Sequence, residues 1–327
     1  MLLPSPIYTL LLQRGARLQG MEITDFGDPV REYEAMDKAA GLVDRSYLTK
    51  LRIAGSDAAE WLQGQVSNDV TKLQPEGRLS CLVCTPTGQI VADCSVWRVQ
   101  DHFVMLAPGS QRTALIERLQ RMLVSEDVRI EDVTERYALL SLIGPHVSKE
   151  WSEGHPFGPT NAVRGNGLDV LVANEGEQDF LASLVERAAP VGTIAYHVRR
   201  IEDGVPLYGV EMDARTLPQE MGADFERDHI SYTKGCYTGQ EVVARIHSRG
   251  HTNRQLCGVR WEADVPVGAR VFAGNAEVGI VTSTCRSFAL GVPISLAVSR
   301  REAAEPGTKV RAEGVEGEVC ELPFVRR

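Results

Sequence analysis

The sequence predicts an α+β protein with antiparallel sheets and a β-rich carboxy-terminal domain. Three observations point to this class: strand-like runs arrive in pairs joined by turn residues, helical segments fall between them without strict alternation, and helical periodicity nearly vanishes after Gly250. Regular alternation of strands and helices would favour a doubly wound parallel sheet instead. The length of 327 residues suits two or three domains, each able to bury a core.

The region up to Val124 carries both helical and strand periodicity. Apolar residues at helical spacing predict a helix over Val30–Ala40, which Gly41 is expected to end. Ser56 is the expected cap of a second helix that continues through Leu62. We also expect a strand at Leu51–Ile53, a hairpin of Leu79–Cys84 and Ile90–Val99 around a TPTG turn, a strand at Asp101–Leu106 and a helix at Arg112–Val124.

The same kinds of element recur between Tyr137 and Asp203. Here we expect a strand at Tyr137–Ile143, a hairpin of Asn161–Arg164 and Leu168–Ala173 around Gly165–Gly167, and helices at Glu177–Ala188 and Thr193–Asp203. Because the strands again arrive as a hairpin, this region is also expected to form an antiparallel sheet.

The chain after Gly250 is expected to form a separate domain, residues 251–327, that follows a larger region, residues 1–250. Several short strands with Gly or Pro between them are typical of a small β-barrel or sandwich. These strands are expected at Leu256–Trp261, Gly268–Ala273, Glu277–Cys285, Phe288–Val298, Lys309–Arg311 and Glu316–Cys320.

Composition argues against several classes of protein. With 35 basic and 44 acidic side chains the net charge is −9, which disfavours direct binding of nucleic acid as the main activity. Seven scattered cysteines do not form a disulfide framework and favour a reducing cytoplasm. Since no apolar stretch is long enough to cross a bilayer, we expect no membrane span.

The most unusual stretch is KGCYTGQEVVAR, Lys234–Arg245. Thr238 and Glu241 have the spacing of a capping box, so Cys236 is expected just ahead of a helix N-terminus with Lys234 nearby. Both features favour a thiolate that is nucleophilic or binds a metal. The alternative is a buried, inert thiol in a tight turn.

Two carboxylates and a cysteine pair are further candidates. Asp93 lies in an apolar strand and Asp169 follows a tight turn, so each either binds a polar heterocycle or faces solvent. Cys81 and Cys84 should point to opposite sides of their strand, and no second ligand pair completes a zinc set, so no metal is expected. Phosphate-binding glycine loops and a G-x-S-x-G nucleophile are absent.

Lys234–Leu256, KGCYTGQEVVARIHSRGHTNRQL, resembles the signature of the YgfZ-type folate-binding proteins, relatives of the glycine-cleavage T-protein aminomethyltransferase. Three other stretches resemble blocks that both groups share: Gly41–Val70, Thr85–Arg98 and Arg199–Gly222. The resemblance implies two interleaved mixed α/β subdomains, approximately residues 20–135 and 136–250, and a carboxy-terminal barrel around a channel for tetrahydrofolate or a derivative.

The resemblance also implies roles for individual residues. Asp93 matches an aspartate beside the reactive nitrogens of the folate, and Asp169 matches a pterin-binding glutamate. Tyr196 stands four residues ahead of Arg200, where aminomethyltransferases keep an arginine, and this departure weakens the case for aminomethyl transfer; both remain candidate folate-binding residues. Cys236 would react with a sulfur or iron species or with a folate-borne one-carbon unit.

The remaining motif residues carry lesser expectations. Gly235 and Gly239 are expected to shape the turn. Arg245 either binds an anion or forms a surface ion pair on the helix. The other members of the motif are Tyr237, Gln240 and Glu241.

The function that the resemblance implies is a tetrahydrofolate-binding accessory protein, cytoplasmic and monomeric by default, that supports assembly or repair of iron–sulfur proteins. Its partners would be iron–sulfur enzymes, including those that thiolate transfer RNA, or their assembly proteins. One alternative is a folate-dependent aminomethyltransferase or demethylase. Another is a protein-binding scaffold with a vestigial folate pocket.

Overall fold

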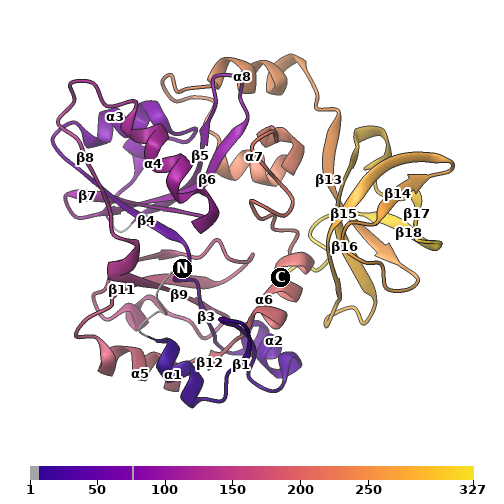
Figure 1. Cartoon of the computed structure of the whole chain (residues 1–327), viewed down its shortest axis with the longest axis horizontal. Coiled ribbons are helices and arrows are strands. Elements are labelled where there is room, and N and C mark those ends of the chain that lie inside the picture. The colour runs from indigo at the N-terminus through magenta and orange to yellow at the C-terminus, as the bar shows by residue number, and fades with distance from the viewer. Residues whose placement is uncertain (1–6, 76) are drawn as a thin grey trace. The chain divides into compact units, whose positions relative to one another are not determined.

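The computed structural model describes residues 7–75 and 77–327, which divide into two compact units (Figure 1). Unit 1 comprises Met1–Cys84, Val91–Tyr196 and His229–Thr238, and unit 2 comprises Thr85–Ile90, His197–Asp228 and Gly239–Arg327. Each unit is therefore assembled from stretches that are far apart in the chain. Within the described part of the chain, no helix is both long and apolar enough to span a membrane.

Unit 1 contains two five-stranded sheets, which we call sheet I and sheet II. Sheet I has the order β5-β6-β7-β4-β8, with strands Arg78–Cys84, Ile90–Val99, His102–Ala107, Thr49–Ala54 and Arg129–Asp132. Sheet II has the order β10-β11-β9-β3-β12, with strands Phe157–Pro159, Gly167–Ala173, Tyr137–Ile143, Gly41–Asp44 and Ala189–Pro190. A two-stranded ribbon joins β1 (Arg17–Gln19) to β2 (Glu22–Asp25).

The chain passes back and forth between the two sheets. Strand β3 pairs with β9 in sheet II, whereas β4, the next strand along the chain, pairs with β7 in sheet I. The expected α+β class with antiparallel sheets and interleaved subdomains is thus confirmed. One parallel pair, β12 with β3, is the exception to antiparallel pairing in sheet II.

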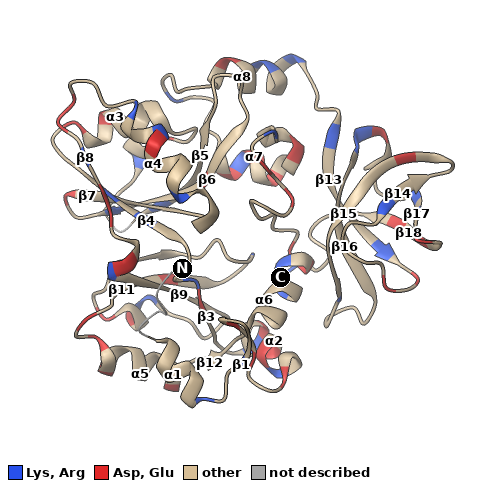
Figure 2. Ribbon diagram, viewed as in Figure 1, with Lys and Arg blue, Asp and Glu red and all other residues tan. Residues whose placement is uncertain are grey.

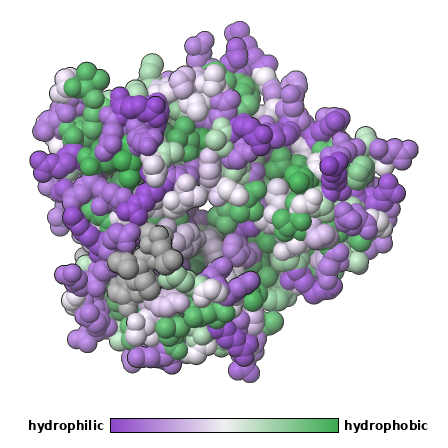
Figure 3. Space-filling model, viewed as in Figure 1, coloured by the Kyte–Doolittle hydropathy of each residue, from purple (hydrophilic) through white to green (hydrophobic). Residues whose placement is uncertain are grey.

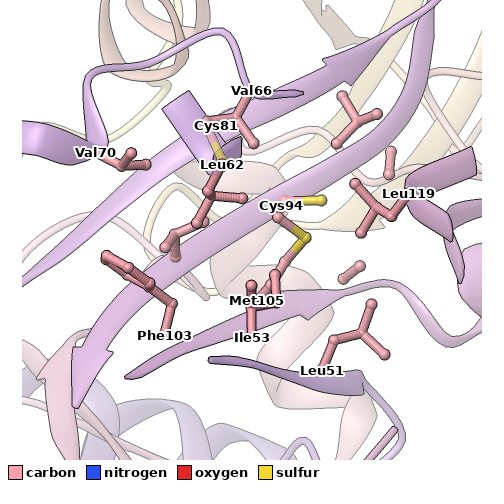
Figure 4. Close-up of a cluster of buried hydrophobic side chains, with 14 of the residues drawn as sticks. Leu51, Ile53, Leu62, Val66, Val70, Cys81, Cys94, Phe103, Met105 and Leu119 are labelled. Carbon is pink, nitrogen blue, oxygen red and sulfur yellow. The ribbon is translucent and has the colours of Figure 1, made fainter. Parts of the chain in front are cut away.

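Helices cover the outer face of each sheet in unit 1. Alternate residues of β5, β6 and β7, including Cys81, Cys94 and Met105, pack with α3 (Ala58–Gln65) and α4 (Arg112–Gln120), as Figure 4 shows in close-up. Sheet II is covered by α1 (Tyr8–Gln13) and α5 (Gln178–Arg187). Helix α2 (Pro29–Lys38) precedes β3.

The inner faces of the two sheets pack against each other. Trp97 and Leu106 of sheet I share a buried cluster with Leu139 and Leu171 of sheet II. These are the residues that alternate with the helix-facing set, as a period of two requires. Polar side chains on the same inner faces are therefore brought together between the sheets.

Unit 2 contains a closed β-barrel, which is one of the two expected architectures; the other was a sandwich. Its order is β13-β16-β15-β14-β17-β18. The strands are Arg254–Trp261, Pro293–Arg300, Ala276–Arg286, Arg270–Ala273, Lys309–Ala312 and Val315–Cys320. Helices α7 (Ala223–His229), whose last residue belongs to unit 1, and α8 (Gln240–Arg249) precede it, and α6 (Thr193–Glu202) begins in unit 1 and ends in unit 2.

Charged and apolar residues are mixed on the surface. In Figure 2 acidic and basic residues are scattered over the barrel, where Arg270 pairs with Glu277 at 2.9 Å and Lys309 pairs with Glu318 at 2.5 Å. Hydrophilic residues likewise interrupt the hydrophobic ones on the visible face in Figure 3. Exposed pairs of this kind contribute little to stability but keep the surface hydrated.

Most expected elements are confirmed, but the expectations at Ser56 and at residues 161–164 are wrong. Ser56 does not cap α3: Asp57 precedes this helix without a side-chain cap, and the Ser56 hydroxyl donates to Asp127 at 2.9 Å. Residues 161–164 form no strand, because β10 takes the place opposite β11, with Phe157 paired to Val170. Helix α2 is confirmed; its cap is Asp28, which accepts from the Arg31 amide, and Pro29 starts it.

Candidate functional site

Asp169 lies on the inner face of sheet II, directly opposite Ser141 in the ladder of β11 and β9. Its carboxylate is fully buried, with 0% of the side chain exposed. Ser141 Oγ donates to Oδ1 at 2.6 Å, and the Nη1 atoms of Arg45 and Arg78 each donate to Oδ2 at 3.4 Å. The alternative of a solvent-exposed hairpin residue is therefore wrong.

Arg78 has donors that no described residue accepts. It begins β5, its side chain is only 4% exposed, and its Nη1 also donates to the Pro159 carbonyl. Its Nε and Nη2 atoms are buried without a partner among the described residues, as are Arg45 Nε and Trp97 Nε1. An unpaired buried donor costs about 1–3 kcal/mol, so this donor set is suited to a ligand or ordered water that supplies acceptors.

Arg78 and Trp97 both lie beside Gly158 of β10. A Cβ atom at this glycine would lie 3.1 Å from Arg78 Cβ and 3.7 Å from Trp97 Cε2. The missing side chain on β10 thus leaves room for both residues between the sheets. Because both border one glycine, their unpaired N–H groups occupy the same neighbourhood.

Asp93 lies on the inner face of sheet I, since it alternates with the helix-facing Ala92 and Cys94 and shares its face with Trp97. Its carboxylate is partly exposed and its Oδ1 atom lies 3.2 Å from His229 Nε2. Its charge also acts on Arg78. We call Arg45, Arg78, Asp93, Trp97 and Asp169 the inter-sheet polar cluster.

Burial and neighbouring charges together determine the pKa values of the two arginines in this cluster. Burial lowers the pKa of Arg78 to about 10, against the opposing effect of Asp169. Burial alone would also lower the pKa of Arg45, but Tyr196 and Asp169 together raise it above its ordinary value. The Tyr196 hydroxyl donates to the Ala162 carbonyl at 3.3 Å, so this residue also lies beside the cluster.

Arg200 is placed differently, because it belongs to unit 2. Its Nη1 donates to the Val205 carbonyl at 2.8 Å and to Glu211 at 3.1 Å. Its Nη2 donates to Ser283 Oγ at 2.7 Å, and its Nε donates to His197 Nδ1 at 3.4 Å. All three guanidinium nitrogens are thus engaged by protein atoms, which weighs against a role in binding folate.

The first half of the KGCYTGQE motif lies in unit 1. The Cys236 thiol is exposed, while the Gly235 backbone beside it is also open to solvent. Lys234 turns inward, donates to the carbonyls of Gln63 and Val66 at 2.5 Å, and places its Nζ 4.9 Å from the centre of the Tyr237 ring. Burial lowers the pKa of Lys234 to about 8, an effect that nearby Cys81 opposes.

The second half of the motif begins helix α8, and the expected capping box is wrong. Gly239 precedes Gln240, the first helical residue, and no side chain caps this end. Gly239 has φ of 89°, a left-handed conformation that glycine adopts without the steric cost of a side chain. Glu241 and Arg245 are exposed on the helix.

The Cys81 and Cys84 thiols are both buried, and burial raises the pKa of Cys84 to about 12. A buried, protonated thiol is a poor nucleophile and a poor metal ligand. Across residues 7–75 and 77–327, no three His, Cys, Asp or Glu side chains are grouped so as to hold a metal ion.

Sequence reasoning missed Arg45, Arg78, Trp97 and His229. The signal available for Arg45 and Arg78 was a charged residue at the end of an apolar strand, which also occurs on ordinary surfaces. Nothing local links His229 to Asp93, because their contact depends on how a distant segment docks on sheet I.

Comparison with known proteins places the fold in a recognised class. Residues 24–152 match the GCVT N-terminal domain, and residues 254–326 match the glycine cleavage T-protein C-terminal barrel domain. The crystal structure of glycine cleavage system aminomethyltransferase T from Bartonella henselae superposes with a TM-score of 0.87 at 18% identity, covering 99% of this chain and 98% of that one. The architecture is thus aminomethyltransferase-like.

Sequence relatives establish the family. An aminomethyltransferase from Rubrobacter xylanophilus is 30% identical over 356 residues, covering 99% of this chain and 94% of the relative. One from Shouchella clausii is 28% identical over 364 residues, covering 100% and 98%. The chain therefore belongs to the glycine cleavage T-protein (aminomethyltransferase) family.

Proposed function

We propose that the chain binds tetrahydrofolate or a derivative at the inter-sheet polar cluster of unit 1. The observation that carries this proposal is the set of buried donors on Arg78, Trp97 and Arg45 that find no acceptor among the described residues, with the carboxylate of Asp93 close enough to act on Arg78. A pterin ring presents both acceptors, its oxo group and ring nitrogens, and N–H donors. The cluster therefore offers partners of both kinds to such a ring.

The residues of the cluster would have different roles in binding the pterin ring. Arg78 and Trp97 would donate to the ring acceptors, and Asp93 would accept from a ring N–H. Asp169 would act through the arginines, because its own oxygens already accept from Ser141, Arg45 and Arg78. When bound, tetrahydrofolate supplies N5 and N10 as carriers of a one-carbon unit.

We propose further that the protein acts as an accessory factor in the assembly or repair of iron–sulfur proteins, in the cytoplasm. The support is the resemblance of the KGCYTGQE motif to the YgfZ type, together with an exposed thiol at Cys236 that a protein partner or a sulfur or iron species can reach. Partners would be iron–sulfur enzymes or assembly proteins, including those that thiolate transfer RNA.

A second candidate function is folate-dependent aminomethyl transfer, or a related demethylation. It is favoured by the names of relatives such as the Rubrobacter xylanophilus and Shouchella clausii aminomethyltransferases. Tyr196 at the position of an expected arginine speaks against it. Reconstitution of glycine cleavage decides between the accessory role and aminomethyl transfer. Substantial formation of methylene-tetrahydrofolate from the aminomethylated carrier protein would contradict the accessory role.

Binding itself is tested by titrating the purified protein with tetrahydrofolate and following tryptophan fluorescence, since Trp97 lies in the cluster. We expect a saturable change that Arg78→Met weakens by at least about tenfold, the usual worth of a charged hydrogen bond. Arg270→Met, at an exposed arginine of the barrel, is the matched control and should bind as wild type does. A titration without saturation would favour the scaffold alternative.

The accessory role is tested by complementing a strain that lacks its own homologue and scoring iron–sulfur enzyme activity. Wild type should restore that activity and Cys236→Ala should not. Cys320→Ala, at another cysteine that is not fully buried, is the control. If Cys236→Ala restores activity as well as wild type, the role proposed for this thiol is wrong.

A further inference from the structure

We propose that His229 is a positioning residue that orients the carboxylate of Asp93 toward the ligand. The two side chains form a pair, with His229 Nε2 3.2 Å from Asp93 Oδ1, and both are largely buried, with 11% and 18% of the side chain exposed. At this separation the imidazole restricts the rotation of the carboxylate, although the contact does not have the geometry of a hydrogen bond. The inference rests on the folate site proposed above.

The segment that carries His229 is held on sheet I by Ser67. The Ser67 hydroxyl donates to the His229 carbonyl at 2.6 Å and accepts from the Leu82 amide of β5 at 2.8 Å. Two residues further on, the Ser231 amide donates to the Ser67 carbonyl at 3.0 Å. The backbone is thus held at His229 and again at Ser231, which fixes where the imidazole can reach.

The backbone of Asp93 is held independently of its carboxylate. Its amide donates to Gln111 Oε1 at 3.3 Å, while Gln111 Nε2 donates to the Val91 carbonyl. These bonds fix the strand but leave the rotation of the carboxylate undetermined. His229 Nε2 lies within ion-pair distance of Oδ1, and Oδ1 itself is buried without a hydrogen-bond partner among the described residues.

The imidazole thus limits the rotation of the carboxylate through its contact with Oδ1, while Oδ1 can still accept a hydrogen bond. An unsatisfied acceptor beside the unpaired donors of Arg78 suits a ring that offers an N–H next to an acceptor atom. The charged and titratable groups that act with Asp93 are Arg78 and Cys81 of β5, Cys94 of β6 and His229 itself.

Three variants test the role through binding of 5-formyltetrahydrofolate, a reduced folate that is stable in air. His229→Ala should raise the Kd about tenfold, since it frees the carboxylate to rotate away from the ligand. His229→Gln keeps a side-chain N–H and should stay within about threefold of wild type. His247→Ala is the matched control, because His247 pairs with Glu226 at 2.9 Å in unit 2, and its Kd should not change.

The double variant His229→Ala/Asp93→Asn separates positioning from mere stability. If His229 acts through Asp93, the double variant should bind no more weakly than Asp93→Asn alone, so the two effects are not additive. Additive losses, or wild-type affinity in His229→Ala beside a weakened Asp93→Asn, would overturn the proposal.

The pair can also be observed without ligand, which separates this inference from the folate proposal. In nitrogen-15 spectra of the imidazole, His229 Nε2 should carry the proton that faces Asp93, and Asp93→Asn should shift its resonance. A spectrum that Asp93→Asn leaves unchanged would exclude the contact. If wild type binds no reduced folate, the proposed function is refuted. The nitrogen-15 spectra would still decide whether His229 contacts Asp93.

Discussion

Arg78 in unit 1 and Arg200 in unit 2 are both buried arginines beside a buried carboxylate, yet their donors are used differently. Arg200 is 2% exposed, and every guanidinium nitrogen donates to a protein atom around Glu211. Arg78 is 4% exposed, but its Nε and Nη2 find no acceptor among the described residues. The two guanidinium groups are therefore similarly buried, but all the nitrogens of Arg200 have a hydrogen-bond acceptor and two of the nitrogens of Arg78 do not, within the described part of the chain.

This difference separates a structural arginine from a candidate ligand-binding one. Arg200 uses all its donors within the protein and so joins the end of α6 to the barrel residue Ser283 within unit 2. The unpaired donors of Arg78 carry a desolvation cost, which a ligand that supplies acceptors can offset on binding. The four predictions that follow test this contrast, beginning with the largest expected effect.

Arg200→Met should lower the free energy of unfolding by about 3–5 kcal/mol, because it leaves Glu211 buried without its cation. Urea unfolding followed by circular dichroism measures the loss. The double variant Arg200→Met/Glu211→Gln should recover much of it, since the buried charge is then gone. A loss below about 1 kcal/mol in the single variant would show that Arg200 is not a structural centre of unit 2.

Lys50 extends the contrast to a buried cation whose ammonium group donates to two neutral carbonyls, those of Ser46 at 2.8 Å and Leu48 at 2.9 Å. Burial lowers its pKa to about 8, against the opposing effect of Asp44. The folded state thus binds this proton less tightly than the unfolded chain, so the charged lysine costs stability below about pH 8. That cost disappears as the pH rises from about 8 toward the ordinary value of 10.5.

The stability of wild type relative to Lys50→Met should therefore rise between pH 7 and pH 10, by up to about 3 kcal/mol. Urea unfolding of both proteins at several pH values measures this difference and cancels the titration of other groups. A difference that does not depend on pH would contradict the depressed pKa of Lys50.

Arg78→Met should cost less stability than Arg200→Met, about 1–2 kcal/mol, because Asp169 keeps its bonds to Arg45 and Ser141. The same variant should weaken tetrahydrofolate binding at least about tenfold. Urea unfolding and fluorescence titration on one preparation give both numbers. Equal destabilisation by Arg78→Met and Arg200→Met would remove the distinction between the two arginines.

Cys236→Ala should have the smallest effect on folding, within about 0.5 kcal/mol, because the thiol is exposed. It should also abolish the fastest site of alkylation by iodoacetamide, as mapped by mass spectrometry. Cys94 is the internal reference, since it lies in the core of unit 1 and burial raises the pKa of its thiol well above the ordinary value. Modification of Cys94 in the native protein at the rate of Cys236 would contradict this assignment.

Local sequence pattern predicted much of the fold and part of the candidate site. The hairpin turn at 85–88, the strand Tyr137–Ile143 and the barrel strands follow from period-two patterns and turn residues. The Ser56 cap and the Thr238–Glu241 capping box were wrong, because many sequences satisfy those patterns and neighbouring contacts decide which cap forms. For Asp93 and Asp169 the sequence left burial and solvent exposure equally open.

By itself, the sequence determined the class of fold, the order of most elements and the presence of an unusual cysteine motif. Periodicity and turn chemistry are local properties, and they act within a few residues. Only the tertiary structure decided that β3 joins sheet II while β4 joins sheet I, and that Arg45 reaches Asp169 across 124 positions of the chain. The pairing of distant strands and the satisfaction of buried donors depend on contacts that no local pattern encodes.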